Sequence, residues 1–132
     1  PQVPYLQHRF YTPEPRIDTA LLIADYATAA IDISDGLLAD LNHILVGSNV
    51  GAMISPGELP ISAELHQWVG EAQSREWALT GGEDFELCFT VPAKLEPKLG
   101  WALRHHSVGV TCIGQIQVTP TEWCDLYRAD IR

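Results

Sequence analysis

The chain has 132 residues, the length of one domain, and a chain of this size buries about two-thirds of the surface that its unfolded form exposes. Seventeen acidic residues against eight basic ones give a formal net charge of -9, and no cluster of Lys and Arg interrupts the excess. This charge argues against binding to the nucleic-acid backbone, and a protein of this kind that handles phosphates needs a metal ion.

The first half of the chain predicts a connector followed by alternating helices and strands. Residues 1–15 contain four prolines and no sustained periodicity, so we predict an extended connector between domains. Residues 17–24 have the apolar spacing of an amphipathic helix, with Ile17, Ala20, Leu21 and Ala24 on its apolar face. A buried strand over 28–33, a leucine-rich helix ended by Gly47 and Gly51, and an alternating strand over 50–54 follow.

The second half predicts a helix from Ile61 to Gly70 and a strand over 85–91 with strict alternation. In that strand we expect Phe85, Leu87, Phe89 and Val91 to face the core. A helix over 93–106 and a strand over 110–118, interrupted by Gly114, complete the pattern. The order of elements predicts a layered α+β domain whose mixed β-sheet is covered by helices.

The three cysteines and the hydropathy pattern bear on where the protein works. Cys88, Cys112 and Cys124 are odd in number and lack CxxC spacing, which favours reduced thiols in a cytoplasmic protein over disulfides or a zinc site. No apolar run of about 18 residues and no basic-then-apolar leader occurs, so we expect no membrane segment and no signal peptide.

Two acids stand at the turn between the strand at 28–33 and the helix after it. Ser34 is a good N-cap and Asp35 suits a first helical turn, so both have a structural explanation. Asp32 has none, because it follows an apolar strand where an unpaired carboxylate loses hydration. Two carboxylates and a hydroxyl at this spacing also suit Mg²⁺. Metal binding and capping therefore both stay open, whereas an EF-hand loop does not fit.

A second unusual stretch is Gly81-Gly82-Glu83-Asp84, directly before the strand at 85–91. The two glycines allow a left-handed backbone or close approach of a ligand. Acids beside such a turn are usually solvated; the functional alternative is a loop that places Glu83 against a cationic or hydrogen-bonding ligand.

The segments AIDISDGLLADLNHI (30–44) and ALTGGEDFELCFTVP (78–92) together resemble the C-terminal domain of thiamine monophosphate kinase. Its superfamily also contains aminoimidazole ribonucleotide synthetase and selenophosphate synthetase, and the resemblance extends from about Arg16 to about Val118. It implies that ATP phosphorylates thiamine monophosphate to thiamine diphosphate with Mg²⁺. Phe85 departs from the pattern, since the family often has tyrosine there.

The resemblance also implies roles for individual residues. Asp32 and Asp35 would bind Mg²⁺, Ser34 would contact ATP, and Glu83 would contact the thiamine substrate. No residue is assigned a covalent or acid-base catalytic role. Further loop contacts are expected from Gly36, Gly81, Gly82 and Asp84.

By the same resemblance, residues 16–132 form the C-terminal domain of a kinase whose N-terminal domain is absent. The complete protein is expected to be a homodimer, and the chain alone is expected to be inactive. A metal-dependent phosphatase and a noncatalytic ligand-binding or assembly domain are the alternative functions.

Overall fold

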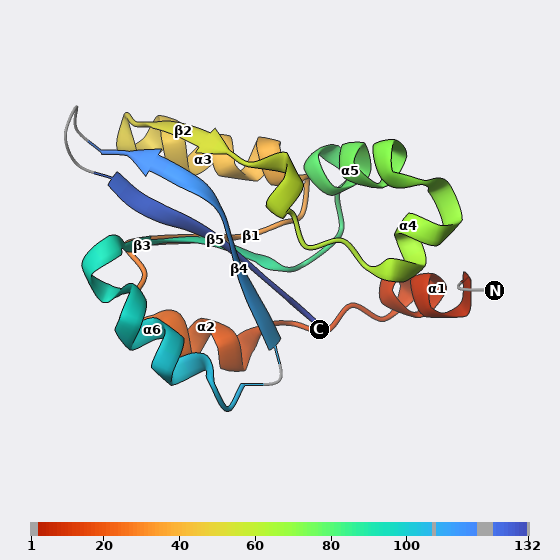
Figure 1. Ribbon diagram of the computed structural model, residues 1–132, viewed down its shortest axis with the longest axis horizontal. Coiled ribbons are helices and arrows are strands. Elements are labelled where there is room, and N and C mark those ends of the chain that lie inside the picture. Colours follow the sequence, from red (N-terminus) through yellow and green to blue (C-terminus); the bar gives the residue numbers. More distant parts are fainter. Residues whose placement is uncertain (1–2, 107, 119–122, 132) are drawn as a thin grey trace.

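The computed structural model describes residues 3–106, 108–118 and 123–131 (Figure 1). Its helices are α1 (Val3–Tyr11), α2 (Ile17–Ile23), α3 (Leu37–Ser48), α4 (Ala63–Val69), α5 (Glu71–Thr80) and α6 (Glu96–Leu103). Its strands are β1 (Ala29–Asp32), β2 (Gly51–Ile54), β3 (Leu87–Pro92), β4 (Val108–Gln117) and β5 (Trp123–Ile131). Single turns of 3₁₀ helix, η1 (Pro56–Glu58) and η2 (Ala93–Leu95), precede α4 and α6.

The strands form one sheet in the order β1-β3-β5-β4-β2, and every described pairing is antiparallel. The α+β fold is confirmed, but the prediction of a mixed sheet is wrong. The strands β1 and β2, joined by α3, run in the same direction but lie at opposite edges. Three other strands separate them, so they never pair in parallel. The predicted interruption of β4 corresponds to a β-bulge between Cys112 and Gly114, where the register against β5 shifts by one residue.

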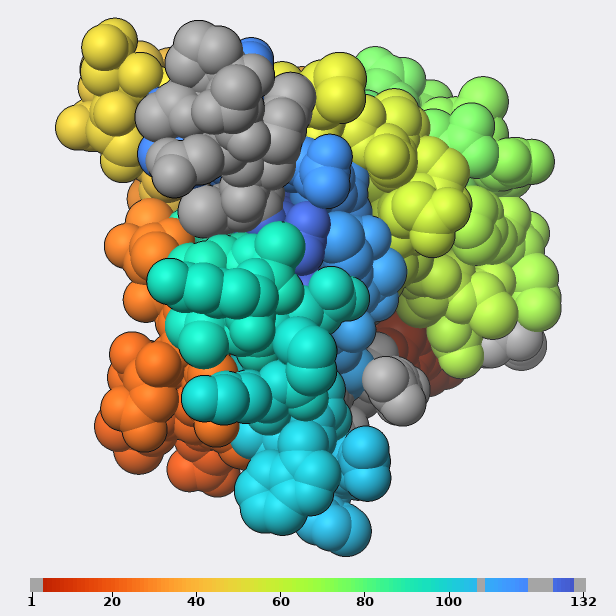
Figure 2. All heavy atoms as spheres, turned by 60° about the vertical axis from the view of Figure 1, so that its left-hand side comes forward, coloured from red at the N-terminus to blue at the C-terminus, as the bar shows by residue number. Residues whose placement is uncertain are grey.

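Helices cover both faces of the sheet, as Figure 1 shows. One core cluster joins Leu37 and Leu41 of α3 to Cys88 of β3. The other joins Ile23 of α2 and Leu99 of α6 to Phe89, and Figure 2 shows these two helices side by side, in orange and teal.

Strand β3 is therefore buried on both faces. Cys88 and Phe89 point to opposite faces and each is 0% exposed, so the prediction of a single core face was wrong. The side chains of β3 do alternate, but alternation shows only which residues share a face of the sheet. Helices cover both faces, so the side chains on both faces are buried. Phe85 is not part of this strand and is 37% exposed.

The extended conformation predicted for residues 1–15 is wrong for Val3–Tyr11, which form α1. Pro4 lies in the first helical turn, where its missing N–H costs no helical hydrogen bond. Pro13 and Pro15 lie after the last residue of this helix and do not interrupt it. The role of the segment as a connector between domains stays a prediction, and residues 1–2 lie outside the described part.

The helix predicted after Arg16 is confirmed as α2, but its buried face is not the predicted one. Ile17 and Leu21 are 63% and 71% exposed, whereas Thr19 and Ile23 are buried. Both pairs have i, i+4 spacing, so spacing alone does not select between them in a helix of two turns.

Two elements have no counterpart in the predicted pattern. Helix α5 buries the small residues Ser74 and Ala78 and so lacks a large apolar stripe. Strand β5 lies between β3 and β4 and buries Asp125 and Arg128, so charged residues interrupt its apolar alternation. Helix α5 is buried through small residues, and in β5 the buried apolar residues Leu126, Tyr127 and Ala129 are mixed with buried charged ones. Neither element therefore has the regular apolar period that sequence analysis detects.

The structure describes the side chains of two of the three cysteines. Cys88 and Cys112 are free, and burial raises the pKa of the Cys88 thiol to about 12. The side chain of Cys124 lies outside the described part. None of the helices in the described ranges is both long and apolar enough to span a membrane.

Candidate active site at the acidic turn and the GGED loop

The acidic turn, residues 32–36, begins at Asp32, the last residue of β1. Helix α3 begins at Leu37, and its N-cap is Gly36, with φ of 122°. Ser34 is therefore not the N-cap and Asp35 precedes the helix, so the capping interpretation of both residues is wrong.

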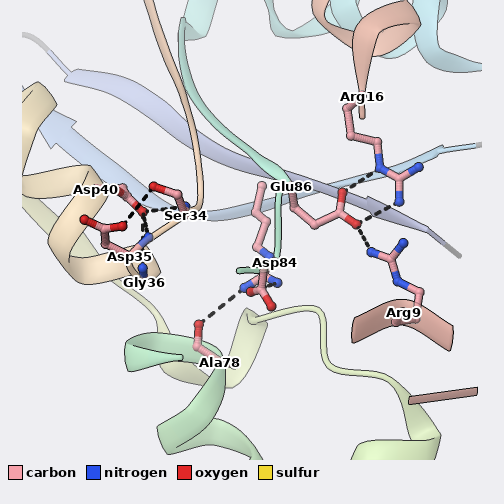
Figure 3. Close-up of polar contacts among 10 residues, drawn as sticks. Arg9, Arg16, Ser34, Asp35, Gly36, Asp40, Ala78, Asp84 and Glu86 are labelled. Carbon is pink, nitrogen blue, oxygen red and sulfur yellow. Dashed lines mark hydrogen bonds and ion pairs between the residues drawn. The ribbon is translucent and has the colours of Figure 1, made fainter. Parts of the chain in front are cut away.

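Asp40 makes the hydrogen bonds that close this turn. Its Oδ2 accepts from the backbone N–H groups of residues 34, 35 and 36, at 2.9, 3.0 and 3.2 Å (Figure 3). Asp40 is 3% exposed and lies in the first turn of α3. Sequence reasoning missed it; the available signal was an acid four residues after Gly36, within reach of the orphan amides at a helix start.

Because Asp40 satisfies these amides, the carboxylates of Asp32 and Asp35 remain available to a ligand. Both residues are exposed. The Ser34 hydroxyl donates to Asp35 Oδ1 at 3.1 Å, and no ion pair in the described ranges involves either carboxylate.

The GGED loop, residues 81–86 between α5 and β3, lies directly against this turn. The backbone N–H of Glu83 donates to the C=O of Ser34 at 2.7 Å, and that of Phe85 donates to the C=O of Ile33 at 2.8 Å. Two motifs that are far apart in the sequence thus lie side by side. Asp32, Ser34, Asp35 and Glu83 are brought together by main-chain hydrogen bonds.

The glycines allow this close approach of backbone to backbone. A Cβ at Gly82 would lie 2.6 Å from the carbonyl oxygen of Ser34, and one at Gly36 would lie 2.7 Å from that of Thr80. A Cβ at Gly81 would meet the Trp77 carbonyl oxygen at 2.6 Å. Packing of the two motifs therefore accounts for all three glycines, whatever contacts they make to a ligand.

Two residues of the loop have left-handed backbones although they are not glycine. Glu83 has φ of 64° and Phe85 has φ of 52°. Such conformations cost about 1 to 3 kcal/mol each and persist where the surroundings hold them. They occur at active sites and ligand-binding loops more often than elsewhere, which supports a functional interpretation of this loop.

Arginines pair with Asp84 and Glu86, the two residues that alternate with Glu83 and Phe85. Glu86 accepts two hydrogen bonds from Arg16, at 2.7 and 2.8 Å, and also pairs with Arg9 (Figure 3). Asp84 Oδ2 accepts from Arg128 Nη2 at 2.9 Å. Burial raises the pKa of the Asp84 carboxyl, and the neighbouring Arg128 offsets only part of that rise.

The side chains that could donate oxygen ligands indicate which metal ion this site suits. No group of three His, Cys, Asp or Glu side chains in the described part of the chain is arranged to hold a metal ion. Asp32 and Asp35 supply two carboxylates on one exposed turn. Mg²⁺ is usually bound by one or two carboxylates together with waters and substrate phosphates. The residues therefore fit a Mg²⁺ ion that is shared with a phosphate ligand.

Comparison with known proteins shows which proteins this chain is similar to. No protein-family model matches the chain. Thiamine-monophosphate kinase of Escherichia coli (strain K12) is 48% identical over 112 residues, which are 85% of this chain and 34% of the relative. The chain is homologous to part of thiamine-monophosphate kinase. The kinase of Bacillus subtilis (strain 168) is 43% identical over 88 residues, 66% of this chain and 26% of the relative.

Solved structures of thiamine-monophosphate kinase share the fold. The crystal structure of the Stenotrophomonas maltophilia K279a enzyme has a TM-score of 0.84 and 41% identity, covering 87% of this chain and 36% of that one. AaThiL complexed with AMPPCP and TMP has a TM-score of 0.67 and 31% identity, covering 100% of this chain and 37% of that one. The resemblance to thiamine-monophosphate kinase is confirmed. The chain spans about a third of the length of the curated relatives it matches.

Proposed function

We propose that this chain is the part of a thiamine-monophosphate kinase that presents the acidic turn to Mg²⁺ and ATP and the GGED loop to thiamine monophosphate. The main support is the 2.7 Å hydrogen bond from Glu83 to Ser34, which joins the two motifs in one site. The similarity to AaThiL complexed with AMPPCP and TMP supports two phosphorylated ligands for such a site. No observation favours the phosphatase alternative.

Four side chains of the acidic turn and the GGED loop have roles in this proposal. Asp32 and Asp35 hold Mg²⁺, which when bound offsets the charge of the transferring phosphoryl group. The Ser34 hydroxyl binds ATP, and the Glu83 carboxylate binds the cationic thiamine. The acceptor phosphate is already ionised at neutral pH, so the transfer requires alignment and charge neutralisation and no strong general base.

Main-chain groups of the loops complete the contacts to the ligands. Gly36, Gly81 and Gly82 allow the backbone to come close to the ligands, and Asp84 anchors the loop through its hydrogen bond with Arg128. In the complete protein, a further domain supplies the other ligand contacts and a dimer interface, and the enzyme works in the cytoplasm.

We expect the chain to fold alone and to be inactive until it is combined with the rest of the protein. Two clusters of buried residues give the chain a core of its own. The exposed carboxylates of Asp32 and Asp35, however, would contact only one side of the bound ligands. Alignment of two substrates supplies about 7 to 11 kcal/mol of barrier lowering, which one face alone does not provide. The measurements are thermal unfolding of residues 1–132 and ATP-dependent formation of thiamine diphosphate.

A cooperative melt without turnover, and turnover once the missing part is added, would agree with this proposal. Ligand retention with no turnover in the complete protein would favour the noncatalytic alternative. Phosphate release without ATP would favour the phosphatase.

In the full-length protein, Glu83→Ala should raise the KM for thiamine monophosphate and leave the KM for ATP nearly unchanged. A hydrogen bond to a charged group contributes about 1.5 to 3 kcal/mol, so the expected rise is roughly 10- to 100-fold. Initial-rate kinetics with each substrate varied in turn measures both constants. Glu58→Ala, at an exposed glutamate of η1, is the matched control. Equal rises in both KM values would contradict the assignment of Glu83 to the thiamine side.

A further inference from the structure

Residues 83–86 alternate between two environments. Glu83 and Phe85 have left-handed backbones and exposed side chains. Asp84 and Glu86 are instead paired with arginines: Asp84 with Arg128, and Glu86 with Arg9 and Arg16, the pair of arginines labelled in Figure 3. The inward residues anchor the loop, and the residues between them are displayed at the surface.

Arg128 anchors this loop from the middle of the sheet. It lies in β5, in register with Cys88 of β3 and Thr111 of β4, and is 6% exposed. Its Nη1 donates to the C=O of Ala78 at 3.3 Å, and its Nη2 donates to Asp84 Oδ2 at 2.9 Å. Its Nε has no hydrogen-bond partner in the described part, so these two contacts account for its described hydrogen bonding.

The two partners of Arg128 lie on either side of the two glycines. Ala78 belongs to the last turn of α5, and Asp84 follows Glu83 in the loop. One planar guanidinium therefore ties together the beginning and the end of the segment that contains Gly81, Gly82 and Glu83. A lysine would retain the charge but would lack two donors in a fixed plane.

We propose that Arg128 is a positioning residue that holds the backbone of Glu83 beside the acidic turn and so orients its carboxylate, an inference that rests on the proposed role of Glu83 toward thiamine monophosphate. The Glu83 backbone is held on one side by the C=O of Ser34 and on the other by its neighbour Asp84. Removal of the Arg128 guanidinium removes the second of these two anchors. Without that anchor the Glu83 backbone can relax from its left-handed conformation, and the Glu83 carboxylate then moves away from its position.

The test uses the full-length protein with Arg128→Met, Arg128→Lys and Asp84→Asn. Arg75→Met, which breaks the exposed ion pair with Glu71 on α5, is the control. Kinetics gives the KM for thiamine monophosphate and for ATP. Hydrogen–deuterium exchange reports separately on the amides of Glu83 and Phe85, which donate to the acidic turn.

For Arg128→Met we expect at least about a tenfold rise in the KM for thiamine monophosphate, because a misplacement of about 1 Å can cost 100-fold. The KM for ATP should stay within about threefold, and both loop amides should exchange faster while the β3 amides stay protected. Arg128→Lys should recover part of the loss. Asp84→Asn should act in the same direction, and combining it with Arg128→Met should add little, because both changes remove one interaction.

The outcomes separate this inference from the proposed function. If Glu83→Ala raises the KM for thiamine monophosphate but Arg128→Met does not, the positioning role is overturned. Unchanged exchange at Glu83 and Phe85 in Arg128→Met would also overturn it. If neither Glu83→Ala nor Arg128→Met changes that KM while the loop amides exchange faster, the assignment of Glu83 to the substrate fails instead. If Arg128→Met does not fold, Asp84→Asn decides by the same readouts.

Discussion

Asp32→Asn in the full-length protein should reduce Mg²⁺-dependent turnover by about 10²- to 10³-fold, which corresponds to about 3 to 4 kcal/mol of transition-state stabilisation. Asp32 is exposed at the end of β1, and no ion pair in the described ranges uses its carboxylate. The substitution keeps the size of the side chain and removes the charge that a hard cation requires. Single-turnover kinetics over a range of Mg²⁺ concentrations measures the effect.

Stability should change little in this variant, by less than about 0.5 kcal/mol, because an exposed carboxylate without a described partner contributes little to folding. The matched control is Asp25→Asn, at an exposed residue in the turn after α2. Full turnover by Asp32→Asn at limiting Mg²⁺ would contradict a metal-binding role. A large loss of stability would indicate a structural role instead.

Glu86→Gln should destabilise the chain by about 3 kcal/mol, the lower end of the cost of removing one partner of a buried ion pair. The Glu86 side chain is 3% exposed and accepts two hydrogen bonds from Arg16, whose own side chain is 5% exposed. Arg9 shares the same carboxylate. The neutral amide leaves two guanidinium groups without their buried counter-charge. Urea unfolding of the wild-type and variant chains measures the difference.

Glu14 provides a matched comparison, because it pairs with the same arginine at 3.4 Å but is 64% exposed. Glu14→Gln should cost no more than about 1 kcal/mol, as expected for a solvent-exposed ion pair. Equal losses in the two variants would show that burial of Glu86 does not determine its contribution.

Local patterns were sufficient to predict the elements that contain the site. The apolar run before Asp32, the leucine repeat after Gly36 and the alternation from Leu87 to Val91 correspond to β1, α3 and β3. Each signal depends on residues close together in the chain, so no tertiary contact is needed to detect it. The two motifs also indicated the resemblance to thiamine-monophosphate kinase, which the relatives and solved structures confirm.

The sequence by itself therefore determined the layered α+β class, the strand-turn-helix around Asp32 and Asp35, and the resemblance to thiamine-monophosphate kinase. The tertiary structure decided that Asp40 closes the acidic turn, that Glu83 is hydrogen-bonded to Ser34, and that buried Arg128 holds Asp84. It also decided which face of α2 is buried and that every described strand pairing is antiparallel. These features join residues that are distant in sequence or depend on what covers a surface, and local periodicity contains neither kind of information.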